Sequence, residues 1–186
     1  MLQLQKEYVQ AGTNILYAPT FTANRVKLAE YHLEKNMSSM IHDLVAISKE
    51  AAASTPGHPV YVAGDITMTG EQLRPMGKME LEDLIAIYKE QILCLVDAGA
   101  DLLVVETMMS LAETRAALIA AKEVCDLPVI ATLTFEADGR TLFGTDAKTA
   151  AVVLESLGAS AIGANCSTGP AQMEGIISDM VSVTTI

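Results

Sequence analysis

A junction that recurs three times constrains this chain more than any other feature. In QAGTNILY, DAGADLLVV and SLGASAIGA, a helical stretch ends at a glycine and an apolar run follows two or three residues later. The glycines are Gly12, Gly99 and Gly158. Glycine suits this position because the residue just after a helix often needs a positive φ angle. The recurrence predicts a chain built from repeated helix–strand units.

The apolar runs themselves have the pattern of strands buried on both faces. They cover residues 14–21, 60–66, 101–107, 128–135 and 160–166. None of them alternates polar and apolar residues, as a half-exposed strand would. Continuous apolar strands are typical of parallel sheets covered by helices. The chain is therefore predicted to have an α/β fold with parallel strands.

The helical stretches carry matching signals. Residues 81–99 place their large apolar side chains on one helical stripe. Ser110 and Glu113 have the spacing of a capping box, and Thr145 or Asp146 is expected to cap the helix that follows. Helices that bury one face fit an outer layer packed against a sheet.

Polar residues recur where the predicted strands end, and this favours a barrel over a doubly wound sheet. A dinucleotide-binding sheet would carry G-x-G-x-x-G after a strand, which is not found here. A (β/α)₈ TIM barrel instead gathers its site from the carboxyl ends of several strands, and it needs roughly 250 residues. With 186 residues and five predicted strands, we expect a single domain, 1–186, that is a partial barrel truncated at both ends. The strand-end residues are Thr20, Asp65, Glu106, Thr107, Thr134, Asn165 and Cys166.

Composition excludes several classes of partner. The net charge is −11, and no basic patch is visible that could bind phosphates. Aromatic residues make up only 4% of the chain, so base-stacking platforms are not expected. No stretch approaches the ~20 consecutive apolar residues of a membrane span. Neither nucleic acid nor a membrane is an expected partner.

The three cysteines, Cys94, Cys125 and Cys166, bear on the compartment. Their odd number and wide spacing fit a reducing cytoplasm better than a disulfide framework. The amino-terminal residues also lack the basic and apolar regions of a signal peptide. A cytoplasmic location is therefore expected.

Cys166, at the end of the last predicted strand, has three interpretations. It could be a small buried hydrophobe, which is what free cysteine most often is. It could be a nucleophile, although His32, His42 and His58 all lie away from strand ends. It could also be a zinc ligand, but a catalytic zinc site needs about three protein ligands. The other two cysteines lie too far from the strand ends to supply them.

Two carboxylates also lie at strand ends. Glu106 closes the run DLLVVE and could hold a substrate ammonium group, or could simply cap a turn. Asp65 is a similar but weaker candidate for substrate binding, because GDITMTG could be a simple Asx turn. In residues 136–146, Asp138–Gly139 signals a turn, and we expect Arg140 to be solvated there.

Several stretches resemble the homocysteine S-methyltransferase family. The similarity is carried by GADLLVVETMMSLAETRAALIAAKE, TFEADGRTLFGTD and GANCSTGP, with PTFTANRVKL and AGDITMTGEQLRPMG in the same order along the chain. It is strongest to the homocysteine-binding barrel module of the cobalamin-dependent, methionine-forming members. The resemblance covers strands two to six of eight. It implies a (β/α)₈ barrel in which zinc binds the homocysteine thiol, lowers its pKa and lets the thiolate attack a methyl group.

The resemblance also implies roles for individual residues. Cys166 matches the first of three zinc-binding cysteines, and Asn165 accompanies it. Glu106 matches the residue that holds the amino group of homocysteine. Thr20 and Phe21 match a Thr-Phe pair at a strand end that is assigned to substrate binding, although the residues before them depart from the family's usual asparagine.

Two family segments are not found in these 186 residues: an Asp-Gly-rich loop that grips the amino acid and a Gly-Gly-Cys-Cys segment with the other zinc ligands. We therefore expect an incomplete zinc site and no activity for these residues alone. The full enzyme would use zinc and take its methyl group from a donor or from a corrinoid (cobalamin) carried by a partner protein or another domain. The loop motifs GRTLFGTD and GDITMTG favour the corrinoid-linked relatives, and the scarcity of aromatic residues disfavours a cage for a quaternary ammonium donor.

Two other functions remain open at this point. The chain could be a non-catalytic split or degenerate barrel that binds a partner or self-associates. It could also be an unrelated α/β barrel enzyme that uses Asp65 and Glu106 for acid–base chemistry. A partial barrel has two unpaired sheet edges, so we also expect homo-oligomers or poor solubility from residues 1–186 alone.

Overall fold

The computed structural model describes all residues, 1–186, as strands that alternate with helices. The strands are β1 (Ile15–Tyr17), β2 (Tyr61–Ile66), β3 (Leu102–Met108), β4 (Val129–Leu133) and β5 (Ala161–Ala164). The helices are α1 (Leu2–Gln10), α2 (Arg25–Ala29), η1 (Glu34–Asn36), α3 (Met37–Ala52), α4 (Leu81–Asp97), α5 (Leu111–Val124), α6 (Ala147–Ser156) and α7 (Pro170–Val181).

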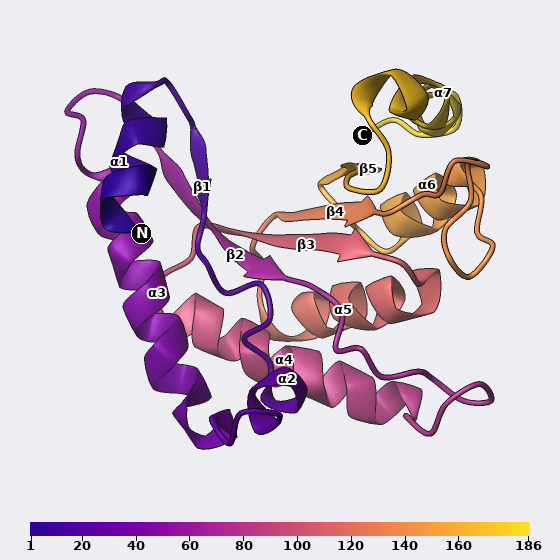
Figure 1. The fold of residues 1–186 in the computed structure, drawn as a ribbon, viewed down its shortest axis with the longest axis horizontal. Coiled ribbons are helices and arrows are strands. Elements are labelled where there is room, and N and C mark those ends of the chain that lie inside the picture. Colours follow the sequence, from indigo (N-terminus) through magenta and orange to yellow (C-terminus); the bar gives the residue numbers. More distant parts are fainter.

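The strands form one five-stranded sheet in the order β1-β2-β3-β4-β5. All four neighbouring pairs are parallel. Every strand lies inside a predicted apolar run or within one residue of it, so the predicted α/β class and parallel order are confirmed. Consecutive parallel strands joined by helices on one side make a sector of a (β/α) barrel, which Figure 1 shows from the side.

The helices lie along one face of the sheet in chain order (Figure 1). Their apolar stripes and the outward-facing strand residues form one large core, which includes Tyr88, Ile92 and Leu95 of α4. Because these side chains are fully buried, α4 holds the centre of the sheet in place. No helix combines the length and the apolarity that crossing a membrane would require.

The glycine junctions have the predicted backbone conformation. Gly12, Gly99 and Gly158 have φ angles of 100°, 89° and 85°. Each follows a helix within two residues and precedes β1, β3 or β5 by a few residues. The recurring junction therefore turns each helix back into the parallel sheet.

Residues on the inner face of the sheet fall into two layers, because side chains alternate across a strand. Ala63, Val104 and Ile130 pack together in an apolar layer. Two residues further along the strands, at the carboxyl ends, come Asp65, Glu106 and other polar residues. This alternation places both carboxylates on the same face and at the same end of the sheet.

A bulge on β3 changes this alternation at the edge. Val105 pairs with Ala131 and Met108 pairs with Leu133, so β3 has one more residue than β4 between these pairs. Met108 therefore returns to the helix-side core, where it is fully buried. The extra residue leaves Glu106 and Thr107 as successive residues at the inner edge.

The predicted helix caps are confirmed in part. Ser110 caps α5 by accepting a hydrogen bond from the Glu113 backbone at 3.4 Å. The reciprocal half of a capping box is absent, because the Glu113 side chain bonds to the β2–α4 loop instead. Asp146, and not Thr145, caps α6 by accepting a hydrogen bond from Thr149.

Candidate functional site

Asn165 lies at the centre of the polar groups at the carboxyl edge of the sheet. Its Nδ2 lies 2.9 Å from Glu106 Oε2 and 2.8 Å from Thr107 Oγ1. Its Oδ1 accepts hydrogen bonds from the Thr107 backbone at 3.1 Å and from the Thr132 hydroxyl at 2.8 Å. Asn165 directly follows β5, so this one amide joins the ends of β3, β4 and β5.

Cys166 belongs to the same group. Its Sγ lies 3.4 Å from Asn165 Nδ2 and 3.5 Å from Thr107 Oγ1. The thiol is exposed to solvent, so the interpretation of Cys166 as core filler is wrong. His42 and His58 contact Asp97 and the Thr13 carbonyl elsewhere, so neither is available to activate the thiol.

The backbone around this thiol is strained. Thr107, Cys166 and Ser167 have φ angles of 57°, 61° and 56°, in the left-handed region. That region is unfavourable for residues other than glycine, and especially for β-branched threonine. Such strain costs about 1–3 kcal/mol per residue and is concentrated at functional sites. Here it aims the Thr107 hydroxyl and the Cys166 thiol at one another.

Asp65 and Glu106 form a carboxyl pair beside Asn165. Burial first, and then the charge of Glu106 and a hydrogen bond with it, raise the pKa of Asp65 to about 8. Burial also raises the pKa of Glu106. Asp65 is only 6% exposed and Glu106 is half-buried, so burial favours the protonated form of both carboxyl groups compared with carboxyl groups in water.

Tyr17 completes the inner face next to this pair and was not among the residues selected from the sequence. Burial and the two carboxylates raise the pKa of its hydroxyl. Tyr17 is 42% exposed, so this residue is accessible to solvent. The alternation of side chains along the first predicted strand is the signal that could have indicated Tyr17. In the structure Tyr17 pairs with Ala63, which points to the same face of the sheet as Asp65.

Thr20 and Gln91 fix the backbone behind Asp65. The Thr20 hydroxyl donates to the Asp65 carbonyl at 2.9 Å and accepts from the Asp65 N–H at 3.0 Å. Gln91, fully buried on α4, donates to the Thr20 carbonyl. Phe21, the other residue of the pair selected from the sequence, accepts a backbone hydrogen bond from Thr67. Direct contact of Thr20 or Phe21 with a substrate stays a prediction.

The residues described here do not fit a complete zinc site. No group of three or more His, Cys, Asp or Glu side chains is arranged to hold a metal ion. Cys94 lies within α4 and Cys125 follows α5, so neither joins Cys166 at the carboxyl edge. A catalytic zinc ion needs about three protein ligands, and this edge supplies one thiol.

A second polar cluster lies under the β2–α4 loop, outside the sheet. Glu113 is buried, and its Oε1 accepts hydrogen bonds from the Thr69 N–H, the Thr69 hydroxyl and the Tyr88 hydroxyl, all within 2.9 Å. Thr67 links this loop to the strand end by donating to the Glu106 carbonyl at 2.8 Å. Glu113 therefore anchors the loop that begins directly after Asp65 and Ile66.

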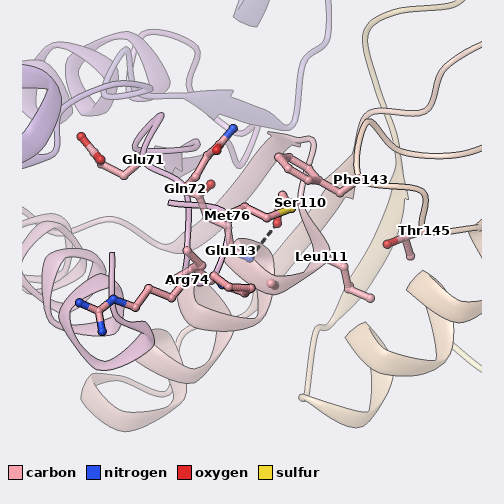
Figure 2. Close-up of a pocket in the computed structure, with 12 residues that line it drawn as sticks. Glu71, Gln72, Arg74, Met76, Ser110, Leu111, Glu113, Phe143 and Thr145 are labelled. Atoms are coloured by element: carbon pink, nitrogen blue, oxygen red, sulfur yellow. Dashed lines mark hydrogen bonds between the residues drawn. The ribbon is translucent and has the colours of Figure 1, made fainter. Parts of the chain in front are cut away.

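A hollow of about 320 Å³ adjoins this cluster, between the β2–α4 loop, the start of α5 and Phe143. Figure 2 shows the Ser110–Glu113 contact at the hollow, with Met76 and Phe143 beside it. Arg74 on its rim is paired with Glu80 at 2.7 Å. Because Arg74 and the buried Glu113 at this hollow already have partners, we place the candidate site at the strand ends and not here.

Comparison with known proteins gives a consistent family assignment. The model of the family described as homocysteine S-methyltransferase matches residues 1–186. Methionine synthase from Mycobacterium leprae is 30% identical over 177 residues, which is 91% of this chain and 15% of that protein. Methionine synthase from Mycobacterium tuberculosis has the same identity and coverage. The chain thus spans about a seventh of the length of these relatives.

The solved structures show the same fold. The homocysteine methyltransferase MmuM from Escherichia coli, in its metallated form, superposes with a TM-score of 0.84. The match covers 98% of this chain and 68% of that one, at 19% identity. At this identity the likeness supports the barrel architecture alone.

Proposed function

Because the chain belongs to the homocysteine S-methyltransferase family, we propose that the protein containing it transfers a methyl group to the sulfur of homocysteine and forms methionine. The single observation that carries this proposal is the Asn165 bridge between Glu106 and Cys166. The bridge keeps a carboxylate and a thiol within the roughly 10 Å that one small amino-acid thiol can span.

In this proposal each residue has a distinct task. Glu106 and Asp65 accept the α-ammonium group of homocysteine. Asn165 holds the Glu106 carboxylate and the Cys166 thiol in fixed directions, so the substrate sulfur is directed toward Cys166. Thr20 supports Asp65 through hydrogen bonds to its backbone, and Phe21 follows Thr20 in the chain. Fixing both ends of a small substrate removes much of the entropy cost of bringing its sulfur to the methyl group.

We assign Cys166 as one ligand of a zinc ion, as the resemblance implies. The other ligands would have to come from residues other than 1–186, so these residues alone are expected to be inactive. The metallated form of the E. coli enzyme supports a metal in this family.

For the methyl donor we propose a corrinoid carried by another domain or by a partner protein. The similarity to two methionine synthases supports a methionine-forming member over other branches of the family. The low aromatic content argues against a cage for a quaternary ammonium donor. The three free cysteines support a reducing compartment such as the cytoplasm.

The experiment that tests this function compares two variants of the full protein. Cys166→Ser should abolish methionine formation and remove bound zinc, because a hydroxyl is a poor zinc ligand. Glu106→Gln should keep the zinc and raise the KM for homocysteine, because it removes only a charge partner of the ammonium group. Methionine formation and zinc content are measured on the same samples. Full zinc and activity in Cys166→Ser would overturn the proposal.

One observation favours a second candidate function. Asp65 and Glu106 are neighbouring, partly or fully buried carboxyl groups with raised pKa values, an arrangement that acid–base catalysis can use. The family match excludes an unrelated barrel enzyme, but a member of this family that works by acid–base catalysis would use this pair without Cys166. It would therefore keep its activity in Cys166→Ser, which separates the two functions in the same experiment.

A further inference from the structure

Tyr17 is a polar residue on the inner face of the sheet to which the proposed function gives no task. It pairs with Ala63 of β2, and paired residues of parallel strands point to the same face, so Tyr17 shares the inner face with Asp65. The backbone of Tyr17 is held by Gln5 of α1, whose Nε2 donates to the Tyr17 carbonyl at 3.0 Å. The phenol therefore extends from a fixed point at the edge of the sheet.

The hydroxyl group of Tyr17 lies close to the two carboxyl groups of the site. Asp65 follows Ala63 by two residues on β2, a rise of about 6.6 Å along the strand. Side chains in strands lean along the strand direction, and a tyrosine side chain is long enough to cover this rise. Burial first, and then the charges of Glu106 and Asp65, raise the pKa of the Tyr17 hydroxyl. The phenol therefore keeps its proton and is available as a hydrogen-bond donor.

This hydroxyl group has no acceptor within the protein. The only side-chain hydrogen bond at Tyr17 is the one that its carbonyl accepts from Gln5. Tyr17 is also 42% exposed, so a ligand on the inner face can reach it. Other side-chain donors around the carboxyl groups are already bonded to protein groups, namely those of Thr20, Thr132 and Asn165. Tyr17 thus offers this face a donor that is both free and accessible.

An anionic group of a ligand meets no cation on this face of residues 1–186. Neither Asp65 nor Glu106 takes part in any of the ion pairs of the structure. No lysine or arginine lowers the pKa of either carboxyl group. A carboxylate that binds beside them must therefore be held by neutral N–H or O–H groups, and the Tyr17 hydroxyl is such a group.

We propose that Tyr17 is a further substrate-binding residue, whose hydroxyl donates a hydrogen bond to the carboxylate of the amino-acid thiol and so selects amino acids over simple amines. This inference rests on the proposed function, in which Glu106 and Asp65 bind the α-ammonium group. The ammonium and carboxylate groups of an amino acid are attached to the same carbon atom. A ligand held at the carboxyl groups therefore brings its carboxylate beside them, within reach of a donor on the β1 side.

The test uses calorimetric binding of two pairs of ligands to the full protein. Homocysteine is compared with 3-aminopropanethiol, and 2-aminobutyrate with propylamine, so the members of each pair differ only by the carboxylate. The variant Tyr17→Phe keeps the ring and removes the hydroxyl. Tyr61→Phe is the matched control, because Tyr61 is exposed on the same face, two residues nearer the amino end of β2 than Ala63. Methionine formation is measured in parallel.

We expect Tyr17→Phe to weaken binding of homocysteine and 2-aminobutyrate by about tenfold to a hundredfold, the range for a lost hydrogen bond to a charged group. Binding of 3-aminopropanethiol and propylamine should change less than twofold, and Tyr61→Phe should change none of the four by more than that. The KM for homocysteine should rise with the dissociation constant while kcat stays nearly constant, because the carboxylate takes no part in methyl transfer.

The outcomes separate the carboxylate contact from the methyl transfer. If methionine forms but Tyr17→Phe weakens both members of each pair equally, or neither, the contact is overturned and the proposed function stands. If no methionine forms while Tyr17→Phe still weakens 2-aminobutyrate and not propylamine, the function is overturned and the contact stands. An equal loss of homocysteine affinity in Tyr61→Phe would also overturn the contact, because the effect would then not depend on the hydroxyl beside the carboxyl groups.

Discussion

Asn165 Nδ2 lies 2.9 Å from Glu106 Oε2, although 59 positions separate the two residues in the chain. Glu106 lies in the last part of the central strand β3, and Asn165 directly follows the edge strand β5. The carboxylate and the thiol next to Asn165 therefore depend on the same side-chain amide for their directions. A change in this amide should affect substrate binding and thiol chemistry together.

The first prediction concerns that amide. In the full protein, Asn165→Ala should lower kcat/KM for homocysteine by about a hundredfold, because it frees both Glu106 and Cys166. Thr132→Val removes only one of the two hydrogen bonds to Asn165 Oδ1, so its effect should be about tenfold or less. Steady-state kinetics on both variants checks the order. Equal losses of kcat/KM in the two variants would show that Asn165 does not hold Glu106 and Cys166 in place.

The second prediction concerns pH and stability. The pKa of Asp65 is near 8 in the folded protein and near 4 when unfolded, so its neutral form stabilises the fold. That contribution is complete below about pH 4 and is lost as the pH rises through 8. The free energy of unfolding of the wild type should therefore fall from pH 5 to pH 8 relative to Asp65→Asn, by about 1–3 kcal/mol. Urea unfolding at both pH values measures it, and a constant difference would contradict it.

The third prediction concerns the loop anchor. Glu113→Ala leaves the Thr69 N–H, the Thr69 hydroxyl and the Tyr88 hydroxyl without their acceptor, and should lower the free energy of unfolding by about 3 kcal/mol. Tyr88→Phe removes one donor and should lower it by about 1 kcal/mol. Urea unfolding gives both values, and faster hydrogen exchange at the Thr69 amide in Glu113→Ala reports loosening of the loop. An unchanged Thr69 amide would contradict the anchoring role.

The fourth prediction concerns the metal. Residues 1–186 alone, dialysed against micromolar zinc, should retain far less than one zinc per chain, because only Cys166 is placed to bind it. Elemental analysis after dialysis provides the measurement, with the Cys166→Ser form of the same residues as the blank. One zinc per chain that is lost in the blank would show that other donors complete the site.

The fifth prediction concerns association. The outer edges of β1 and β5 pair with no strand, and Ile15, Tyr17 and Tyr61 on the inner face near the β1 edge are 37%, 42% and 55% exposed. Unpaired edges next to exposed apolar side chains favour self-association. Residues 1–186 alone should therefore sediment as oligomers or aggregate. A monomer with cooperative thermal unfolding would contradict this.

Much of the fold could be predicted because the strands are continuous apolar runs and because Gly12, Gly99 and Gly158 mark where they begin. These are local signals, and each is visible within ten residues. The alternation of side chains along a strand then places Asp65 and Glu106 on one face without knowledge of the tertiary structure.

The rest of the site depends on contacts between distant strands, which no local pattern reports. Thr132, and not the strand-end Thr134, contacts Asn165, because only the register between β4 and β5 decides which threonine lies beside it. The Glu113 side chain left its expected capping position because a buried carboxylate gains more from three donors, two on Thr69 of the neighbouring loop and one on Tyr88 of α4, than from one backbone N–H. Tyr17 was missed since its strand is only three residues long.

The bulge on β3 also determines how this segment tolerates changes in length. Thr107 is the extra residue relative to β4, so its deletion would leave a regular strand with Met108 still in the helix-side core, but would remove the backbone N–H and the hydroxyl that contact Asn165 and Cys166. An insertion in the exposed part of the 136–146 loop, which follows the next strand β4, would shift no strand. Gaps in an alignment of this protein with its relatives should therefore be frequent in that loop and absent between Val105 and Met108, where a single missing codon would remove the residue that contacts both Asn165 and Cys166.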